Sequence, residues 1–241
     1  DNELFEELNH EEASRRAGRQ LNNGGILFEK GGYIEPKALC QDLLSHKNIN
    51  LKLSSTVEKI DVDNNNLKLI INGEVSEYQD VCLCAGYTSK ELLNFSGISS
   101  KRGQISYVDS SKEFENLKFP ICASGYFSPK IKGSHILGSS YSDVTNDSVL
   151  EEEHISNKKK LKVIHNFNVN IHGGNVGFRA VTKDRLPLVG CNKGIYVNTG
   201  HGSRGSTSSP LCAEIIADLI DNRPLPVDHE VAIALDANRF N

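Results

Sequence analysis

The sequence predicts a mixed α/β (α+β) fold in which an antiparallel β-sheet domain is inserted into a parallel α/β frame. Residues 81–85 form an apolar run without alternation that ends in a small-residue turn, which is typical of a parallel strand covered on both faces. Residues 195–199 form a second strand-like run, which a glycine-rich turn joins to a helical pattern. Between these runs, residues 101–190 contain short β-prone pieces separated by loops, which favours an antiparallel sheet.

The composition of the 241 residues is that of one or two globular domains, and it excludes several other classes of protein. The net charge of −4 argues against a basic nucleic-acid-binding face spread over the whole surface. No apolar run approaches the ~20 residues that a membrane helix needs, and the N-terminus is too acidic for a signal peptide. The six cysteines show no CxxC spacing, so we expect reduced thiols, no metal site and a cytoplasmic location.

The N-terminal part of the chain predicts two helices and a short strand. Residues 2–19 are rich in Glu, Arg and Ala and predict a helix that stops at Gly18. The apolar residues 26–28 lie between glycine pairs and predict a strand. Pro36 suits the first position of a helix over 36–47, whose leucines share one face.

Alternating and β-prone residues predict strands in the next stretch. Apolar residues alternate with polar ones over 49–53, which predicts a half-buried strand. The β-prone runs 57–62 and 67–71 are separated by an Asp-Asn-Asn-Asn turn signal, so we expect a hairpin. The dipeptide Asn72-Gly73 marks a second tight hairpin.

Two further helices are predicted in the second half of the chain. Residues 148–165 place acidic residues first and basic residues last, which suits the helix dipole and predicts a solvated helix. Residues 208–220 carry one wide apolar stripe, and Asn222 and Pro224 end this helix. The residues after it predict no further strand.

The turn before the last of these helices reads GHGSRG (200–205), a G-x-G-x-x-G spacing. A Rossmann pyrophosphate site needs a second parallel strand after the helix, and none is predicted here. The glycines still let a flat or anionic ligand approach the backbone, and the helix dipole favours negative charge at this point. The alternative is a turn that needs its glycines only for its own geometry.

Several blocks of the sequence resemble the FAD-dependent D-amino-acid-oxidase superfamily. The blocks that carry the resemblance are GFRAVTKDRLPLVG (177–190), TGHGSRG (199–205), SPLCAEIIADLI (209–220) and ALDANRF (234–240). Within this superfamily the sequence most resembles the oxidoreductase half of the bacterial bifunctional proteins of tRNA 5-methylaminomethyl-2-thiouridine biosynthesis. The resemblance covers essentially the whole chain.

The resemblance implies a partial FAD-binding Rossmann-like domain with an inserted antiparallel substrate domain. The implied FAD-binding parts are 33–97 and 190–241, and the implied substrate-domain parts are 1–32 and 98–189. The strand and glycine-rich turn that hold the FAD pyrophosphate in this family have no counterpart in the sequence. Because the chain also contains no Met, we expect it to be the latter part of a larger protein.

The activity that the resemblance implies is that of an FAD-dependent amine oxidoreductase acting on the wobble uridine of tRNA. The enzyme would remove the carboxymethyl group of carboxymethylaminomethyl-uridine as glyoxylate and leave aminomethyl-uridine. The methyltransferase half of the same parent polypeptide would then methylate the amine. Two alternatives stay open, namely a glycine- or sarcosine-oxidase-like enzyme of small amines and a flavin-free fragment without catalysis.

Arg179 and Tyr126 are the predicted catalytic residues. A substrate carboxylate needs a fixed bidentate cation, and Arg supplies the planar fork. The resemblance places Arg179 where relatives clamp the carboxylate, and it matches Tyr126 to a tyrosine directed at the same group. The alternatives are a surface arginine at a strand end and a tyrosine that only packs.

The resemblance also implies the residues that hold FAD. Val57 would meet the adenine edge, and Ala85 with Gly86 would form the turn beside the ribose and diphosphate. Reduction puts negative charge on the pyrimidine end of the flavin, where donors stabilise it. The residues expected there are Gly200, Gly202, Ser203, Arg204 and Gly205. Glycine oxidase has its arginine at the position of Ser203, so the role of Arg204 stays open.

Other polar residues receive no firm role from the sequence. His201 is expected to be hydrogen-bonded within its turn rather than to act as a general base. Arg102 and Gln104 either approach the flavin or only start a strand. Residues 183–185 either lie near the flavin edge or form solvated surface.

Overall fold

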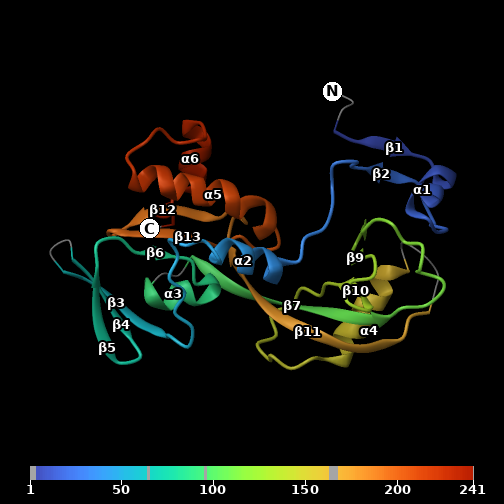
Figure 1. Ribbon diagram of the computed structural model, residues 1–241, viewed down its shortest axis with the longest axis horizontal. Helices are drawn as coiled ribbons and strands as arrows, with labels where there is room; N and C mark the ends of the chain where they lie inside the picture. Colours follow the sequence, from blue (N-terminus) through green and yellow to red (C-terminus); the bar gives the residue numbers. More distant parts are fainter. Residues whose placement is uncertain (1–3, 64–65, 95–96, 163–167, 241) are drawn as a thin grey trace. The chain divides into compact units, whose positions relative to one another are not determined.

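The chain folds into two compact units, which a computed structural model describes for residues 4–63, 66–94, 97–162 and 168–240. Unit 1 comprises Asp1–Glu35 and Arg102–Gly177, and unit 2 comprises Pro36–Lys101 and Phe178–Asn241. Figure 1 shows the helices and strands of both units, coloured along the sequence. Helices and several sheets are both present, so the predicted mixed α/β class is confirmed.

Unit 1 is built on a five-stranded sheet in the order β11-β7-β10-β9-β8. The strands are β7 (Ile98–Asp109), β8 (Ile121–Cys122), β9 (Tyr126–Phe127), β10 (Ser134–Gly138) and β11 (Ile171–Thr182). Strands β7, β10, β9 and β8 pair antiparallel, which confirms the predicted antiparallel insertion. The helix α4 (Glu151–Leu161) packs on β9 and β10 over a core that includes Phe127 and Leu137.

The N-terminal part of unit 1 is a short hairpin and a helix. Strand β1 (Glu6–Leu8) pairs antiparallel with β2 (Gly25–Leu27), and α1 (His10–Ala17) lies between them in the chain. The side chain of Asn9 caps α1 by accepting the Glu12 N–H at 2.9 Å, and Gly18 ends it at a φ of 75°. The prediction of one helix over 2–19 was therefore wrong in its first half, because pairing with β2 outweighs helix propensity there.

Unit 2 contains two three-stranded sheets. The first has the order β12-β13-β6, with β12 (Leu188–Asn192), β13 (Ile195–Thr199) and β6 (Cys82–Leu83). Strand β13 runs parallel to β6, as predicted, and α5 (Gly205–Ile220) packs against β12 and β13. The second sheet is the predicted pair of hairpins, with β3 (Val57–Asp63), β4 (Asn66–Ile71) and β5 (Glu74–Tyr78). The residues of the first turn, 64–65, lie outside the described part.

Short helices complete unit 2. They are α2 (Pro36–Leu44), η1 (Gly86–Thr88), α3 (Ser89–Leu92) and α6 (His229–Leu235). The side chain of Asp228 caps α6 by accepting the Val231 N–H at 3.0 Å. The helix predicted at 36–47 is confirmed as α2, although none of its residues is buried. No helix within the described ranges combines the length and the apolar character that crossing a membrane requires.

Three expectations about burial and pairing need correction. Residues 49–53 form no strand, since no described segment pairs with them, and Leu53 is 76% exposed. Only one face of the strand at 81–85 is covered, because Leu83 is buried while Cys82 and Cys84 are exposed. The helix expected to be solvated buries one polar face in unit 1, as described below. The last residues of that predicted helix, 163–165, lie outside the described part.

Candidate functional site

Two of the predicted cofactor segments lie together in unit 2 because they follow parallel strands. Strand β6 leads into the turn at Ala85 and Gly86, and β13 leads into the glycine turn at 200–205. The carboxyl ends of parallel neighbours lie at the same edge of a sheet, where open α/β sheets bind ligands. The Thr199 hydroxyl donates to the Gly86 carbonyl at 3.0 Å and joins the two turns.

The end of β11 lies against the same glycine turn. The Gly202 N–H donates to the Ala180 carbonyl at 2.8 Å, and Val181 forms a bridge with His201. The ring of Phe178 contacts that of Tyr87, with centroids 5.7 Å apart. The two neighbours of Arg179 in β11 therefore contact these segments. Ala180 contacts the glycine turn, and Phe178 contacts Tyr87 of η1.

Arg179 itself is half-buried in β11. Side chains alternate between the faces of a strand, so Arg179 shares a face with Val181. A Cβ on Gly202 would lie 3.8 Å from Val181 Cγ2, so Val181 lies beside the glycine turn, as does Thr182 on the opposite face of β11. The described backbone thus brings the predicted arginine and the predicted turn into one region of unit 2.

The glycines of this region have different structural needs. A Cβ on Gly200, at a φ of 78°, would lie 2.9 Å from Thr182 Cγ2, so packing alone requires a glycine there. Gly86 has a φ of 61° and would meet nothing within 4 Å, so open space lies in front of it. A Cβ on Gly205 would only reach ordinary contact with His201 Cβ at 3.5 Å.

This geometry fits a flat, partly anionic ligand such as the predicted FAD. In the first turn of α5 the N–H groups of Thr207 and Ser208 donate to the Arg204 carbonyl, and the helix dipole favours negative charge at this end. Arg204 precedes α5 as its N-cap residue and is exposed, as is Ser203. The open space at Gly86 leaves room for a ligand to approach the neighbouring backbone.

Both ring nitrogens of His201 are engaged inside the turn. Nδ1 is 2.8 Å from Ser208 Oγ, and Nε2 is 2.8 Å from Asn198 Oδ1. Burial lowers the pKa of His201. A ring held at both nitrogens fixes the shape of the turn, which agrees with the expectation that His201 is structural.

Asp184 and Arg239 connect two of the sequence blocks that carry the family resemblance. The Arg239 guanidinium binds the carboxylate with two hydrogen bonds, Nε to Oδ2 at 2.8 Å and Nη2 to Oδ1 at 3.0 Å. These bonds, with help from the Leu186 N–H and the Thr182 hydroxyl, hold the pKa of Asp184 well below its usual range. The ion pair therefore fixes Thr182, the residue that packs on Gly200.

The other predicted site residues lie elsewhere. Val57 begins β3 in the second sheet of unit 2, where it is half-buried opposite Ile71. Tyr126 belongs to unit 1 and is half-buried in β9. A Cβ on Gly138 would lie 2.9 Å from the Tyr126 hydroxyl, so the tyrosine side chain packs over this glycine of β10.

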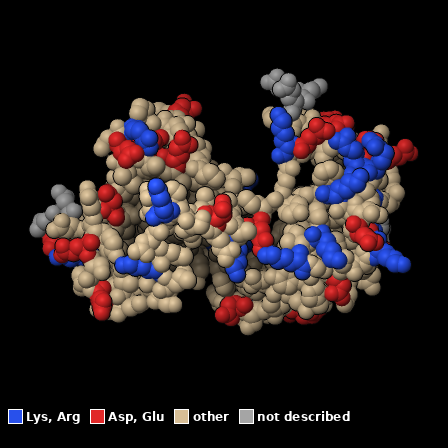
Figure 2. All heavy atoms as spheres, viewed as in Figure 1, with Lys and Arg blue, Asp and Glu red and all other residues tan. Residues whose placement is uncertain are grey.

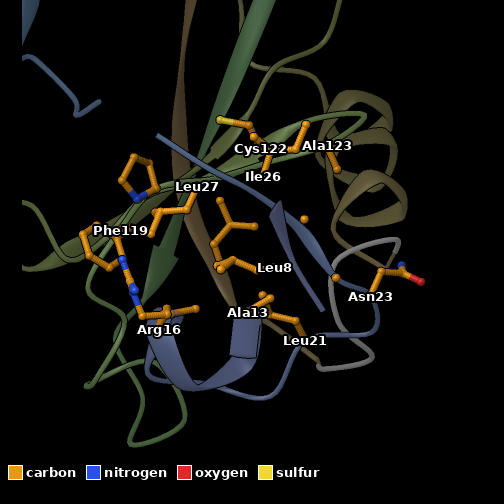
Figure 3. A pocket seen from close by; sticks show the side chains of 15 residues that line it. Leu8, Ala13, Arg16, Leu21, Asn23, Ile26, Leu27, Phe119, Cys122 and Ala123 are labelled. Carbon is orange, nitrogen blue, oxygen red and sulfur yellow. The ribbon is translucent and has the colours of Figure 1, made fainter. Parts of the chain in front are cut away.

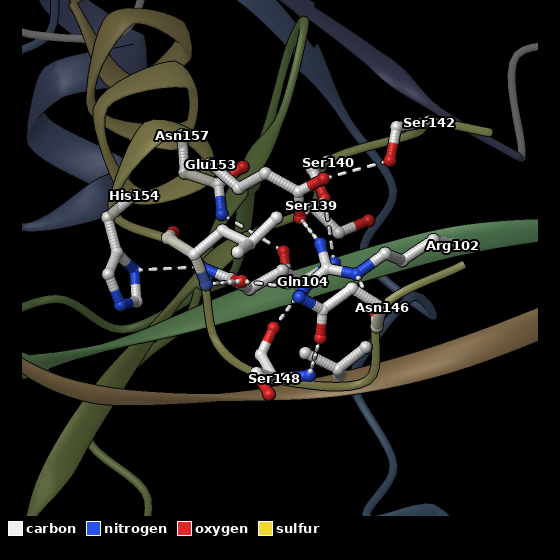
Figure 4. A network of polar contacts seen from close by, with 12 residues as sticks. Arg102, Gln104, Ser139, Ser140, Ser142, Asn146, Ser148, Glu153, His154 and Asn157 are labelled. Atoms are coloured by element: carbon white, nitrogen blue, oxygen red, sulfur yellow. Dashed lines mark hydrogen bonds and ion pairs between the residues drawn. The ribbon is translucent and has the colours of Figure 1, made fainter. Parts of the chain in front are cut away.

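Arg102 and Gln104 form a buried polar network inside unit 1 (Figure 4). Arg102 pairs with Glu153 of α4, and its Nε and Nη2 donate to the carbonyls of Asn146 and Ser148 at 2.7 and 2.5 Å. Gln104 exchanges two hydrogen bonds of 2.8 Å with the backbone of Leu150. Arg102 is fully buried, and each of its three guanidinium nitrogens is bound within unit 1, which favours the structural alternative for these two residues.

The carboxylate of Glu153 is held by three donors. Burial by itself raises the pKa of Glu153, but hydrogen bonds outweigh burial and lower it overall. Those hydrogen bonds come from Ser140, Ser142 and Arg102. The charged form is therefore the form that α4 presents to the sheet.

A separate cavity of about 270 Å³ lies in unit 1 between α1, the β1–β2 hairpin and residues 119–123 (Figure 3). Its lining is mainly apolar and includes Leu8, Ile26 and Phe119, with Arg16, Asn23 and Cys122 as polar members. None of the predicted site residues lines it. Arg16 is already bound to Glu29 at 2.9 Å, so the cavity offers no unpaired charge from this residue.

Surface charges and possible metal ligands give no second candidate site within the described residues. On the face shown in Figure 2, Lys and Arg side chains are interspersed with Asp and Glu on both units. Within the described ranges, no group of three or more His, Cys, Asp or Glu residues is arranged to hold a metal ion. The candidate site is therefore the region of Gly86, Arg179 and the glycine turn in unit 2.

The comparison with protein families identifies the family of the chain. A family model described as FAD dependent oxidoreductase matches residues 2–219 of the chain. The chain belongs to this family. Members of this family use FAD, which confirms the cofactor that the sequence predicts.

Curated relatives of the oxidoreductase share one name, tRNA 5-methylaminomethyl-2-thiouridine biosynthesis bifunctional protein MnmC. The protein of Methylobacillus flagellatus is 30% identical, over 99% of this chain and 42% of its own length. That of Pseudomonas savastanoi pv. phaseolicola is 28% identical, over 98% of this chain and 42% of its own length. The oxidoreductase chain thus spans less than half the length of these relatives.

Solved structures share the fold of the oxidoreductase. Glycine oxidase from Geobacillus kaustophilus superposes with a TM-score of 0.84 at 20% identity, covering 99% of this chain and 68% of that one. Iminodiacetate oxidase from Chelativorans superposes with a TM-score of 0.83 at 16% identity, covering 97% of this chain and 68% of that one. At these identities the similarity shows the fold.

Sequence reasoning missed the residues that join the segments of the oxidoreductase site. The ring contact of Tyr87 with Phe178 and the hydroxyl of Thr199 connect segments far apart in the chain. Thr199 directly precedes the glycine turn and Tyr87 directly follows Gly86, so adjacency to a predicted turn was the available signal. The partner of each residue depends on the fold and carries no local signal.

Proposed function

We propose that this oxidoreductase acts on the carboxymethylaminomethyl group of a wobble uridine in tRNA and leaves the aminomethyl group. The relatives named for tRNA 5-methylaminomethyl-2-thiouridine biosynthesis match almost the whole chain, which supports this substrate. In this proposal the partners are tRNA and the methyltransferase half of the same parent polypeptide. A reaction on tRNA places the enzyme in the cytoplasm.

The observation that carries the proposal is the meeting of three segments in unit 2. The turn at Gly86, the glycine turn and the strand of Arg179 are joined by the Thr199, Gly202 and Phe178 contacts. In this proposal the carboxyl edge of the parallel strands binds the ligand, and Arg179 beside it supplies the cation for a carboxylate.

The roles of the residues follow from the chemistry of an amino acid-like substrate. When bound, FAD supplies a hydride acceptor for the carbon between amine and carboxylate, and hydrolysis of the oxidised substrate releases glyoxylate. Arg179 would bind the substrate carboxylate through its fork and so orient that carbon. Tyr126, in unit 1, stays a predicted hydrogen-bond donor to the same carboxylate.

The chain's own residues would hold FAD mainly through backbone. Gly200, Gly202, Ser203, Arg204 and Gly205 would face the pyrimidine end of the flavin, where the N-terminus of α5 favours negative charge. Ala85 and Gly86 would lie beside the ribose and diphosphate, and Val57 would lie at the adenine edge. These contacts need no large change in the described backbone at Gly86, because the space there is open.

A second candidate function is oxidation of a small amine such as glycine or sarcosine. The fold similarity to glycine oxidase favours it, since that enzyme has a TM-score of 0.84 to this chain. Both candidates use Arg179 in the same way, so the substrate separates them. The flavin-free fragment is the third possibility, and cofactor binding separates it from both.

The test begins with addition of FAD to the purified chain, removal of free FAD by gel filtration and measurement of the absorbance of the protein at about 450 nm. We expect bound flavin and turnover of tRNA bearing carboxymethylaminomethyl-uridine, with free glycine and sarcosine as competing substrates. A protein that carries no flavin absorbance after free FAD has been removed supports the flavin-free fragment. Turnover of the free amines with none of the tRNA supports the small-amine oxidase.

Arg179→Lys tests the role of the guanidinium. A point charge replaces the fork, and loss of a hydrogen bond to a charged group costs about 1.5–3 kcal/mol, so we expect KM to rise about tenfold or more. The FAD content should not change. Arg223→Lys is the matched control, since this 56% exposed arginine pairs with Asp218 at the end of α5. Equal kinetics for Arg179→Lys and the parent protein would remove Arg179 from the site.

A further inference from the structure

Cys82 and Cys84 form a pair of exposed thiols at the end of β6. Their Sγ atoms are 3.6 Å apart. Residues two apart in a strand point to the same face, while Leu83 between them points to the opposite face and is 6% exposed. The alternation of the strand therefore brings two accessible sulfurs into contact, and the function proposed above uses neither of them.

The two thiols differ in acidity because they share a hydrogen bond. The hydrogen bond from Cys82 lowers the pKa of Cys84 to about 7, although burial opposes this change. The same contact raises the pKa of Cys82, and burial adds to the increase. A pair of this kind gives up its first proton easily and its second with difficulty. Near neutral pH it therefore contains one nucleophilic thiolate beside one thiol.

The backbone allows the two sulfurs to be joined, though not without strain. At about 3.3 Å per residue, Cα atoms two apart in a strand are separated by about 6.6 Å. Disulfides are found at Cα separations of about 4.4–6.8 Å, so this pair lies near the upper limit. Strand β6 ends at Leu83, so Cys84 lies beyond the last paired residue of the ladder. Strained and exposed disulfides are readily reduced, which is typical of regulatory rather than structural bonds.

We propose that Cys82 and Cys84 are a redox modification site that closes reversibly into an intramolecular disulfide. The oxidant belongs to the class of small-molecule disulfides, of which glutathione disulfide is the example. The Cys84 thiolate attacks one sulfur of the oxidant and releases one glutathione thiolate. Cys82 then loses its proton and attacks Cys84 Sγ, which forms the protein disulfide and releases the second glutathione. Two protein thiols are oxidised by two electrons, and one glutathione disulfide is reduced to two glutathiones.

The position of the pair connects this oxidation to the candidate site. Cys84 directly precedes Ala85, whose carbonyl accepts the Thr88 hydroxyl at 2.8 Å. The next carbonyl, that of Gly86, accepts the Thr199 hydroxyl at 3.0 Å. Drawing Cys84 toward Cys82 shifts the start of this turn, so we expect the oxidised protein to bind FAD more weakly. This consequence rests on the proposed function, whereas the disulfide itself does not.

Mass spectrometry of the whole chain tests the disulfide directly. The protein is equilibrated with mixtures of reduced and oxidised glutathione, quenched with acid, alkylated and cleaved with trypsin. Cleavage after Lys68 and Lys90 gives a peptide, 69–90, that contains both thiols and no other cysteine. We expect this peptide to lose two hydrogens as the proportion of oxidised glutathione rises, and to regain them with dithiothreitol. A peptide that stays fully alkylated at every ratio would overturn the proposal.

Cys82→Ser is the matched variant, because it keeps the reactive thiol and removes the thiol that resolves the mixed disulfide. We expect its peptide 69–90 to carry one glutathione on Cys84 under conditions in which the parent peptide is closed. Glutathione that accumulates on the parent peptide without loss of two hydrogens would also overturn the proposal. FAD titration of the oxidised and reduced parent is a separate measurement. Equal FAD affinity would contradict the coupling to the site and leave the disulfide in place.

Other cysteines do not interfere with the peptide readout. For the intact mass, oxidation of the other exposed cysteines is prevented in a variant that replaces all three with serine, namely Cys40→Ser, Cys122→Ser and Cys191→Ser. The remaining Cys212 is 2% exposed, and burial raises its pKa, so we expect it to stay reduced. The intact mass of this variant should show the same loss of two hydrogens.

Discussion

Unit 1 contains a buried network of charged and polar side chains, whereas unit 2 contains a helix with no buried residue. Unit 1 buries Arg102, Gln104 and Glu153 beneath α4, where hydrogen bonds connect them (Figure 4). Unit 2 leaves α2 without a buried residue, and Leu43 and Leu53 are 61% and 76% exposed. Arg102 and Glu153 in unit 1 are thus better covered than Leu43 and Leu53 in unit 2.

This difference shows what each region contributes to stability. A buried ion pair becomes strongly destabilising when one partner is removed, because the other charge is left without compensation. An exposed leucine contributes little, because folding removes only part of its surface from water. Unit 1 therefore depends on its polar contacts, whereas residues 36–53 of unit 2 add little burial. In unit 2 the buried contacts lie around β12, β13 and α5 instead.

The largest effect is expected from Arg102→Met, which removes the fully buried arginine of unit 1. Glu153 then keeps its charge without its cationic partner, and the carbonyls of Asn146 and Ser148 lose their donor. We expect the free energy of unfolding to fall by about 3–5 kcal/mol. Urea denaturation followed by circular dichroism measures this loss.

Arg15→Met is the control for this prediction. Arg15 is also paired with a glutamate, Glu12, but its side chain is 68% exposed. Exposed pairs contribute about 0–1 kcal/mol, so this variant should unfold almost as the parent does. Similar losses for Arg102→Met and Arg15→Met would show that burial of the pair in unit 1 has no special importance.

A second pair of variants compares the core of unit 2 with its exposed helix. Leu188 in β12 is 1% exposed, whereas Leu43 in α2 is 61% exposed. Leu188→Ala removes buried methyl groups and leaves a cavity, so we expect a loss of about 2–5 kcal/mol. Leu43→Ala should change the free energy of unfolding by less than about 0.5 kcal/mol. A large loss for Leu43→Ala would mean that α2 packs on apolar groups in solution.

Local signals predicted most of the fold correctly. The hairpin turn Asn72-Gly73 has the positive φ values, 50° and 83°, that its residues favour. The parallel strand β6 lies within the apolar run that predicted it, although only one of its faces is covered, and α2 and α5 were recognisable from their spacing. The wrong predictions concern segments whose structure depends on pairing with a distant strand. The strand at Glu6–Leu8 required a partner at 25–27, and the alternating residues 49–53 have no described partner.

The candidate site was predictable in its parts but not in its assembly. The glycine turn and Gly86 follow strands, which is a local pattern, and Arg179 was selected by resemblance. The contacts of Thr199 with Gly86 and of Gly202 with Ala180 join residues that lie far apart in the sequence. The polar face of α4 was missed for a related reason. Only the fold shows that Glu153 meets a buried arginine.

The smallest expected effect concerns two histidines, His135, which is buried in unit 1, and His201, which is half-buried in unit 2. His135 of unit 1 is fully buried, and its Nδ1 is 2.9 Å from the Ser128 carbonyl. Its Nε2 has no described hydrogen-bond partner. Burial lowers the pKa of His135, and the nearby Lys130 lowers it further. His201 of unit 2 also has a pKa lowered by burial, but both of its nitrogens have partners.

These environments predict how stability depends on pH. An unfolded histidine takes up its proton near pH 6.5, so below this pH the unfolded chain binds more protons than the folded one. Stability is therefore complete above about pH 6.5 and falls as the pH decreases toward the folded pKa, by at most about 1.4 kcal/mol per pH unit for one proton. Urea denaturation from pH 7.5 to 5.5 measures this slope. His135→Gln should flatten it more than His201→Gln, because protonated His201 keeps oxygen acceptors at both nitrogens while protonated His135 has none at Nε2. If His201→Gln has the larger effect, the charge-sensitive core lies in unit 2 rather than in unit 1.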